Sequence, residues 1–539
     1  MRIIKYLLPF LLCVVVFLFL AARDLSDENM TFSDESRHLM DGVFISDIIH
    51  DIPSSLSHPI SYAVKYYIRY PALSIFFYYP PLFAIVEGVF FTLFKVSTFY
   101  AHVCVLVFGL IAIIFWFLLV RGKTNTLNTL LLMLLVFTNG TIVYWAKKIM
   151  LEMPTLSFIL IDMYFIDRYL NNRKGLDLFL GICFAILSVL VKQSAGFVFI
   201  VITAVFCLSN KSFFRSRKVI LFVCMVVAIL LFSAVTFKYS KFYISAVILS
   251  GDILSKIKTN LVSLPMLFYH GMNKAVIFFA VIGIVFVVLR KDQLKKYAIF
   301  FAWTMSFYLF NLILLGDNMR YTYFCIPPVY CFAVVGVENS VKRAKKYGPV
   351  FLSAIIVPII AAQFINSVRQ EREYIRGYDQ AAKYIVDNYD GKCVLFDGWY
   401  DGNFIFYVRY HDSERKLVVM RGSKMLVSFA SFKKYFYEER IKTKKEIFRM
   451  LKGFHVRFIV VEERDVFDSV PLRLLRNILK TQASFDLVYS ININTTVEQL
   501  KGTRILVYKY KGRFGPLFST IKLPLSGIGK EFSGEVESL

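Results

Sequence analysis

Two adjacent carboxylates stand in an unusual place, directly after the first hydrophobic stretch of the chain. Asp34 and Glu35 follow the apolar run Ile3–Ala22, in the segment TFSDESRHLMD. A carboxylate beside the hydrocarbon of a membrane has few partners, so burial and neighbouring charge can tune its pKa for proton transfer. Arg37 is close enough in sequence to hold such an acid ionised. The alternative is structural: a solvated helix start, with Ser33 as N-cap and both acids in the first turn, where the helix dipole favours anions.

Further charged residues stand where later apolar runs begin or end. Glu152 begins one run in the sequence LEMP, Lys192 ends another in LVKQ, and Arg320 with Tyr321 opens a third in GDNMRY. Acids and bases at the mouths of membrane bundles tend to mark substrate sites. The alternative is that such side chains only extend to the lipid headgroups, which is the interpretation we favour for Lys147 and Lys148.

The composition predicts the elements that must position these residues. The chain has 539 residues, of which 57% are hydrophobic, with 55 Phe and 32 Tyr, and a mean hydropathy of +0.59. Soluble domains usually have about 45–50% apolar residues. Apolar runs long enough to cross a bilayer recur over the first two-thirds, which predicts a polytopic α-helical membrane protein.

Basic loops orient the expected spans. Arg2 and Lys5 stand at the start of the first run, which places the N-terminus in the cytoplasm and Asp34 outside, with the first run retained as a signal anchor. The later spans are expected at Phe99–Val120, Leu127–Trp145, Met153–Tyr169, Leu176–Val191, Gly196–Leu208, Val219–Phe237, Ala275–Leu289, Tyr297–Leu315, Tyr321–Val337 and Gly348–Phe364.

One apolar run, Leu82–Ser97, is short and carries Glu87 and Lys95. If it crossed the membrane, every later basic loop would lie outside, so we expect a juxtamembrane or re-entrant helix on the outer side. About eleven spans result, an odd number, which places the C-terminal region outside the cell in a multi-pass plasma (inner) membrane protein.

The chain divides into three parts by composition. Residues 1–365 form the expected transmembrane module, with a large first outer loop at 23–98. Residues 366–512 alternate strand-like and helical patterns, which predicts an extracytoplasmic soluble α/β domain. The tail, 513–539, contains Gly and Ser and is expected to be poorly ordered.

The chain does not contain the sequence motifs of several common enzyme classes. HExxH, GxGxxG and GxSxG are absent, and the segment RGKT at 121–124 lacks the first glycine of a P-loop because position 117 is Phe. The eight cysteines form no CxxC pair, so neither a disulfide framework nor a zinc site is expected. Cytoplasmic loops and lipid headgroups account for the net charge of +25 without nucleic acid. An enzyme acting at the outer face would need an activated substrate delivered by the membrane.

The order and sidedness of these motifs resemble the GT-C superfamily of polyprenyl-phosphate-sugar glycosyltransferases. The closest branch is that of the dolichyl-phosphate-mannose protein mannosyltransferases and aminoarabinose transferases, glycosyltransferase family 39-like. Besides DESR, LEMP, LVKQ and the RY pair with its following prolines, the sequence YPPL beginning at Tyr79 carries the resemblance. It covers about the first 360 residues. Two residues depart from the family pattern: Tyr79 stands where Lys or His is frequent, and Glu152 where Asp is common.

The resemblance implies an inverting transfer of a sugar from a polyprenyl phosphate to a hydroxyl group. It implies Asp34 as catalytic base and Glu152 as the second catalytic acid, which positions the acceptor or tunes the base. It also implies a role in substrate binding for Glu35, Arg37, Tyr79, Lys192, Arg320 and Tyr321. The branch generally works without a metal or other cofactor, although paired acids leave room for a divalent ion. The implied partners are the lipid-linked donor, membrane lipids, and an acceptor protein, lipid or polysaccharide.

Two other classes of protein stay open. A transporter or flippase of lipid-linked or amphiphilic substrates would place charges near the bilayer midplane and show repeat symmetry, neither of which the sequence indicates. A membrane-anchored binding protein, working through its outer α/β domain, would give the charges at the bundle mouth no purpose. The α/β domain has no metal, nucleotide or nucleophile motif, and we expect it to cover the outer cavity and shape acceptor choice.

Overall fold

The fold comes from a computed structural model. It describes residues 2–26, 30–75, 79–209, 253–314, 319–341, 347–430, 436–464, 469–525 and 530–536. The expected span Val219–Phe237 lies outside the described residues.

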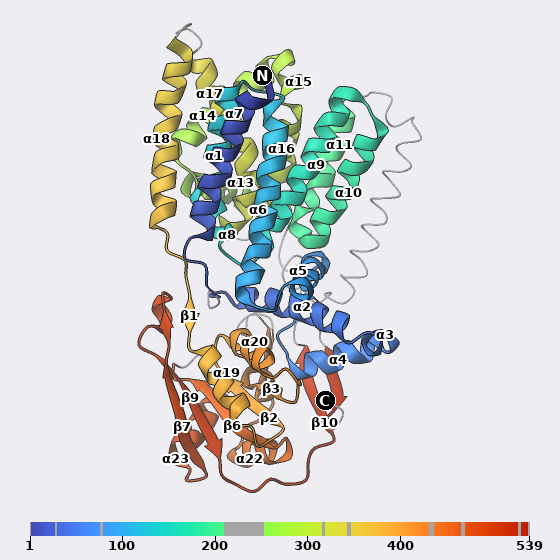
Figure 1. Ribbon diagram of the computed structural model, residues 1–539, viewed down its shortest axis with the longest axis vertical. Helices are drawn as coiled ribbons and strands as arrows, with labels where there is room; N and C mark the ends of the chain where they lie inside the picture. The colour runs from blue at the N-terminus through green and yellow to red at the C-terminus, as the bar shows by residue number, and fades with distance from the viewer. Residues whose placement is uncertain are drawn as a thin grey trace.

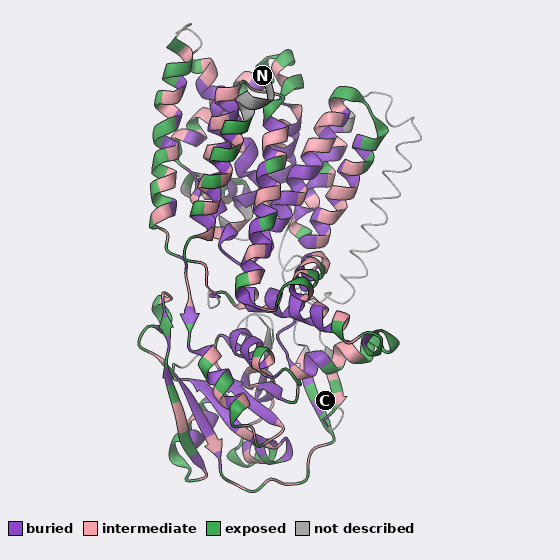
Figure 2. Ribbon diagram, in the orientation of Figure 1, coloured by how far each residue is buried: buried purple, intermediate pink, exposed green. Residues whose placement is uncertain are grey.

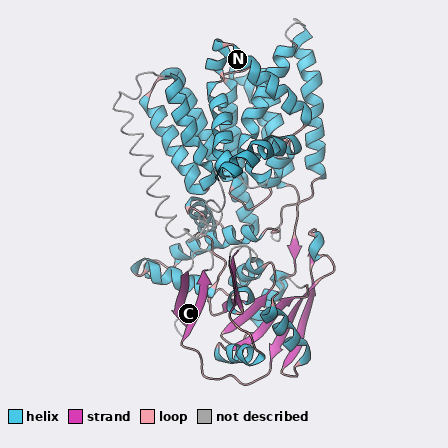
Figure 3. Ribbon diagram, turned by 180° about the vertical axis from the view of Figure 1, so that it is seen from behind, coloured by secondary structure: helices cyan, strands magenta, loops and turns pink. Residues whose placement is uncertain are grey.

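The molecule has a helical bundle at one end and a strand-containing domain at the other, with short helices between them (Figure 1). The N-terminus lies at the end of the bundle far from the strands, and the view from behind shows the same separation of helices from strands (Figure 3). The bundle helices are α1 (Arg2–Ala22), α6 (Thr98–Arg121), α7 (Thr126–Phe137), α8 (Gly140–Ala146), α9 (Glu152–Asn172), α10 (Gly175–Val191), α11 (Phe197–Ser209), α13 (Ile253–Gly271), α14 (Lys274–Leu289), α15 (Lys291–Lys296), α16 (Ala298–Leu314), α17 (Ile326–Ser340) and α18 (Gly348–Arg369).

The expected spans within the described residues correspond to helices, with one interruption. The run Leu127–Trp145 is two helices, α7 and α8, bent by 58°. Asn139 caps the second piece by accepting the backbone N–H groups of Thr141 and Ile142, so the polar pair at 138–139 breaks the helix. Among the described residues, α6 and α18 are long and apolar enough to cross a membrane alone, and up to four spans result when each of two bent pairs counts as one.

Two bundle helices, α14 and α17, pack so closely that their backbones are in contact. A Cβ atom on Gly283 would lie 1.9 Å from the carbonyl oxygen of Phe332, and one on Gly336 would lie 2.0 Å from that of Phe279. Only glycine fits at either position. Small residues at helix contacts are the usual means of close packing inside membranes.

The first outer loop folds into short helices that separate the bundle from the domain. They are α2 (Ser33–His50), α3 (Ser54–Ser57), α4 (Pro59–Arg69) and α5 (Leu82–Leu93). The apolar helix α5 is only 12 residues long and packs on α2 and α6, in the expected region of the juxtamembrane helix. Buried residues continue from the bundle through α2 into the domain (Figure 2).

The C-terminal domain is built on a five-stranded mixed sheet in the order β3-β2-β6-β9-β7. The first three strands in that order run parallel and the last two antiparallel to their neighbours. The alternation of strands and helices expected for residues 366–512 is present as β2 (Cys393–Asp397), β3 (Val418–Arg421), β6 (Val456–Glu462), β7 (Phe485–Asn492), β9 (Arg504–Tyr510), α19 (Tyr378–Asp387), α22 (Lys444–Gly453) and α23 (Val470–Thr481). Not anticipated were α20 (Asp401–His411), α21 (Gly422–Met425), β4 (Val427–Ala430), β5 (Phe436–Glu439), and the short pair β1 (Ile375–Arg376) and β8 (Asn494–Thr495).

The expectation of a poorly ordered tail was wrong for its described part. Strands β10 (Thr520–Leu525) and β11 (Lys530–Glu535) form an antiparallel hairpin. The ring of Phe532 packs edge-on against Tyr67 of α4, with the centroids 5.5 Å apart. A Cβ on Gly534 would meet Ile68. The hairpin is therefore ordered by contacts with the first outer loop, more than 450 residues earlier in the sequence.

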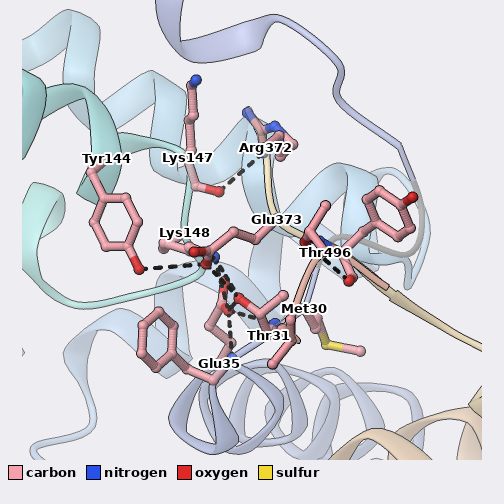
Figure 4. Close-up of polar contacts among 12 residues, drawn as sticks. Met30, Thr31, Glu35, Tyr144, Lys147, Lys148, Arg372, Glu373 and Thr496 are labelled. Carbon is pink, nitrogen blue, oxygen red and sulfur yellow. Dashed lines mark hydrogen bonds and ion pairs between the residues drawn. The ribbon is translucent and has the colours of Figure 1, made fainter. Parts of the chain in front are cut away.

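A cluster of charged residues just after α18 connects the bundle to the domain. The buried guanidinium of Arg372 donates to the backbone carbonyls of Ala21, Arg23 and Lys147. Next to it, Glu373 accepts a hydrogen bond from Lys148 Nζ at 2.6 Å (Figure 4). The end of α1, the loop after α8 and the start of the domain are thus tied at one place.

Candidate active site

The start of α2 is capped by Glu35 rather than by Ser33. The helix begins at Ser33 with Phe32 as N-cap. The Glu35 carboxylate accepts the backbone N–H of Thr31 at 2.9 Å and that of Phe32 at 3.0 Å. It thereby satisfies N–H groups that the first turn leaves without helical partners, as the acid of a capping box does.

Glu35, which was expected to bind substrate, has all of its described contacts within the protein. Its second oxygen accepts the backbone N–H of Ile149 at 3.0 Å, and Lys148 Nζ lies 3.9 Å away (Figure 4). The side chain is 0% exposed. A carboxylate held by three backbone N–H groups and enclosed in protein fixes the start of α2, and it has no surface on which a substrate could bind.

Asp34, by contrast, is partly exposed and faces other polar side chains. The carboxylate lies 3.4 Å from Arg37 Nη1, 3.7 Å from Arg320 Nη1 and 3.5 Å from the Tyr79 hydroxyl. Its side chain is 31% exposed. These separations leave Asp34 without a close ion pair among the described residues, so its carboxylate is able to accept a proton from a hydroxyl group placed beside it.

The second acid is enclosed by the two expected cations. Glu152 is the first residue of α9, where the helix dipole favours an anion. Lys192, which caps the end of α10, has its Nζ 2.5 Å from Glu152 Oε1. Arg320, from the 3₁₀ helix η3 (Met319–Cys325), donates its Nε to the same oxygen. Glu152 is 0% exposed.

The remaining oxygen of Glu152 lacks a partner. Oε2 is buried and has no hydrogen bond to any described residue. Two cations with the charge of one buried carboxylate between them leave a surplus of positive charge beside Asp34. Such a surplus suits a ligand that brings one more negative charge.

The structure therefore brings together Asp34, Arg37, Tyr79, Glu152, Lys192 and Arg320, all six expected at the site. The side chain of Tyr321 lies outside the described residues. No third His, Cys, Asp or Glu among the described side chains joins Asp34 and Glu152 in a group that could hold a metal ion.

Two side chains of this cluster were missed in the sequence. The guanidinium of Arg320 lies over the ring of Trp145, 5.1 Å from its centroid. His38 packs edge-on against Tyr79 with the ring centroids 4.7 Å apart. It is buried, and its Nε2 has no hydrogen-bond partner among the described residues. His38 stands four residues after Asp34, and this spacing on one helix face was the available signal.

Burial sets the protonation state of His38. It lowers the pKa of the imidazole from 6.5 to about 4, and the charge of Asp34 opposes that shift only in part. His38 is therefore neutral at pH 7. It contributes ring contacts, rather than charge, beside the base.

Comparison with known proteins gives matches in family and in fold. Residues 79–237 match the family model of the dolichyl-phosphate-mannose-protein mannosyltransferases. No curated protein matches the chain in sequence.

The chain is similar in structure to ArnT from Cupriavidus metallidurans in the apo state, with a TM-score of 0.57 and 13% identity, covering 96% of this chain and 100% of that one. It is similar to the same protein bound to undecaprenyl phosphate, with a TM-score of 0.56, 13% identity, and 94% and 98% covered. It is also similar to the archaeal oligosaccharyltransferase AglB from Archaeoglobus fulgidus, in complex with an inhibitory peptide and a dolichol-phosphate. That match has a TM-score of 0.51 and 12% identity, over 85% of this chain and 69% of that one.

The family model matches residues 79–237, the part of the chain that contains YPPL, LEMP and LVKQ, and the chain shares the fold of ArnT and AglB over most of its length.

Proposed function

We propose that the protein transfers a sugar from a polyprenyl phosphate to a hydroxyl group on the extracytoplasmic face of the plasma (inner) membrane. The observation that carries the proposal is the convergence of Lys192 and Arg320 on Glu152, with Asp34 on the other side of Arg320. Undecaprenyl phosphate bound to the similar ArnT, and dolichol-phosphate bound to the similar AglB, support the choice of donor.

The proposed step is an inverting displacement at the anomeric carbon. The acceptor oxygen forms a bond to that carbon as the bond from carbon to the phosphate oxygen breaks. Asp34 takes the proton of the acceptor hydroxyl. The electron pair of the broken bond leaves on the polyprenyl phosphate, whose charge Lys192 and Arg320 stabilise.

The other residues of the cluster have positioning roles in this scheme. Glu152 holds the ammonium of Lys192 and the guanidinium of Arg320 side by side, so both cations face the phosphate in a fixed geometry. Tyr79 and Arg37 orient the carboxylate of Asp34. A bound divalent ion is not needed in any of these steps.

The proposed topology has about eleven spans with the C-terminal domain outside. Support comes from the position of that domain, which packs on α2 at the same end of the bundle as Asp34 (Figure 1). Cysteine labelling from outside should reach a residue of the domain in intact cells and should fail to reach one in the 170–175 loop. Labelling with the opposite pattern would overturn the orientation.

Reconstitution tests the activity. Vesicles containing the purified protein should consume a radiolabelled polyprenyl-phosphate sugar and release polyprenyl phosphate when acceptor is supplied. Vesicles with Asp34→Asn protein are the matched control. A transporter or flippase, the second candidate, would move the labelled lipid between leaflets and leave the sugar–phosphate bond intact, so analysis of the lipid after incubation separates the two functions.

A further inference from the structure

A polar cavity lies away from the Asp34 site, between the first outer loop and the C-terminal domain. Its volume is about 520 Å³. One wall comes from the end of α2 and from α4, including Tyr62, Lys65 and Arg69. The opposite wall comes from the domain and includes Tyr389 and Arg415. Cavities of about 300–1,000 Å³ are the usual size of small-molecule sites, and this one would enclose one or two sugar rings.

The cavity has a surplus of positive charge. Five basic and two acidic side chains line it, which leaves three positive charges. The acids are already paired: Arg415 holds Asp51 through contacts of 2.6 and 2.7 Å, and Lys416 pairs with Glu414. Among the described residues, Lys65 and Arg69 have no ion pair, and the buried Nε of Arg69 has no hydrogen-bond partner. An anion is the ligand that would satisfy them.

Tyrosine rings form the less polar part of the same walls. The hydroxyl of Tyr62 donates to Asp51 at 2.7 Å, and that of Tyr66 donates to Asp47 at 2.6 Å. These contacts fix the two rings, whose centroids lie 6.1 Å apart. Rigid aromatic faces among hydrogen-bonding groups suit a ligand with apolar faces and polar edges, which is the character of a saccharide.

The cavity and the candidate active site lie at opposite ends of one helix. Asp34 is in the first turn of α2, and Asp51 directly follows its last residue. Seventeen residues at 1.5 Å each separate them by about 25 Å. A small molecule in the cavity therefore cannot present a hydroxyl to Asp34, whereas an extended molecule can occupy both places.

We propose that this cavity binds an anionic saccharide unit, carrying a carboxylate or a phosphate, of an extended acceptor. The acceptor role rests on the proposed transferase function, while the binding of an anionic saccharide does not. The acceptor is then an acidic glycan or a glycan-bearing molecule, recognised at a point remote from the hydroxyl that receives the sugar.

Calorimetry on the detergent-solubilised full chain tests the site. Digalacturonate and mannose 6-phosphate are the anionic probes, and digalactose is the neutral control. At least one anionic probe should bind, and digalactose should bind at least tenfold more weakly. The double variant Lys65→Gln/Arg69→Gln should weaken that binding at least tenfold. The matched control Lys383→Gln/Lys480→Gln removes two exposed charges elsewhere in the domain and should bind as the wild type does.

Results that differ from these would overturn the proposed site or assign it to another ligand. Failure of both anionic probes to bind, equal binding of digalactose, or insensitivity to the Lys65/Arg69 change would overturn the site. Displacement of the bound probe by phosphatidylglycerol micelles at equal phosphate concentration would assign the cavity to lipid headgroups instead. The Asp34→Asn variant should retain the binding. If the probe binds as expected but no donor sugar is ever consumed, the site stands and the transferase function fails.

Discussion

Arg409 of the C-terminal domain forms a two-contact ion pair with Asp47 of α2. Its Nε lies 2.9 Å from one carboxylate oxygen and its Nη2 lies 2.5 Å from the other. Both side chains are largely buried, at 15% and 8% exposed. Nearby, a Cβ on Gly402 would lie 2.2 Å from Ser36 Oγ. The domain therefore sits directly on the helix that carries Asp34, and its position can affect the site without supplying a reacting group.

Replacing Arg409 with Ala should destabilise this contact. The change leaves the Asp47 carboxylate buried without its cation, which costs about 3–5 kcal/mol for a buried pair. Arg504 forms the same two-contact geometry with Glu463, but both side chains are well exposed. Arg504→Ala is the matched control and should cost little stability, because solvent screens an exposed pair. Thermal unfolding measures both, and equal losses would show that the Arg409 pair contributes no more than a surface pair.

Asp34→Asn should abolish most of the sugar transfer. The amide keeps the size of the carboxylate but cannot accept the proton, so transfer should fall about a hundredfold or more. Binding of the polyprenyl-phosphate donor should survive. Asp24→Asn, at an exposed acid paired with Arg23, is the control. Single-turnover transfer with labelled donor is the measurement, and near-normal transfer by the Asp34 variant would remove it from the catalytic role.

Two variants separate the roles of Lys192. Lys192→Met should lower both stability and donor binding, because Glu152 loses one of its two cations inside the protein. The double variant Lys192→Met/Glu152→Gln restores the wild-type net charge of the cluster, one positive, without restoring the ammonium group. Donor binding should stay at least about tenfold weaker, since a charged hydrogen bond to phosphate is still lost. If donor binding recovers in the double variant, Lys192 serves only to neutralise Glu152.

His38→Phe should change how stability depends on pH. The pKa of His38 is about 4 in the folded protein and 6.5 as an unperturbed group. Between these values the unfolded chain binds a proton that the folded chain does not. The contribution of neutral His38 to the free energy of unfolding is therefore complete above pH 6.5. It falls by about 3 kcal/mol as the pH is lowered toward 4. The Phe variant should lack this loss, whereas His58→Phe, at an exposed position, should keep it.

Melting temperatures from pH 4 to 8 give the comparison for His38. Buried Asp41, whose pKa burial raises to about 7, titrates in the same range in the opposite sense. Its contribution is common to both proteins and cancels in the difference. A pH dependence of stability that is identical in wild type and His38→Phe would contradict the neutral, buried state of His38.

The charged residues at the ends of apolar runs could be predicted from sequence because a span fixes depth and side together. Glu152 begins α9, Lys192 ends α10 and Arg320 precedes α17, so their meeting follows from topology alone. Asp34 follows the same logic. Their pairing could not be predicted: that Glu152, rather than Asp34, is enclosed by both cations depends on how α9, α10 and η3 pack.

Contacts between residues that are far apart in the sequence could not be predicted. Glu35 stands beside Asp34 in sequence, yet its carboxylate is held by the backbone of Ile149, 114 residues later. Asp47 meets Arg409 over 362 residues. The hairpin at the end of the chain is likewise ordered by Tyr67 and Ile68. No local pattern encodes such contacts, because each depends on the docking of the domain onto the first outer loop.

The position of Arg320 also sets the order in which the site is completed during synthesis. Arg320 lies 168 residues after Glu152, which is roughly 8–34 seconds of translation at about 5–20 residues per second. From the synthesis of Lys192, 40 residues after Glu152, until that of Arg320, the nascent chain contains both acids but only one of the two cations that meet at Glu152. A partly made chain therefore lacks the surplus of positive charge that the finished cluster has. The surplus of positive charge beside Asp34 is complete only once Arg320 has been inserted, when about two-fifths of the chain is still to follow.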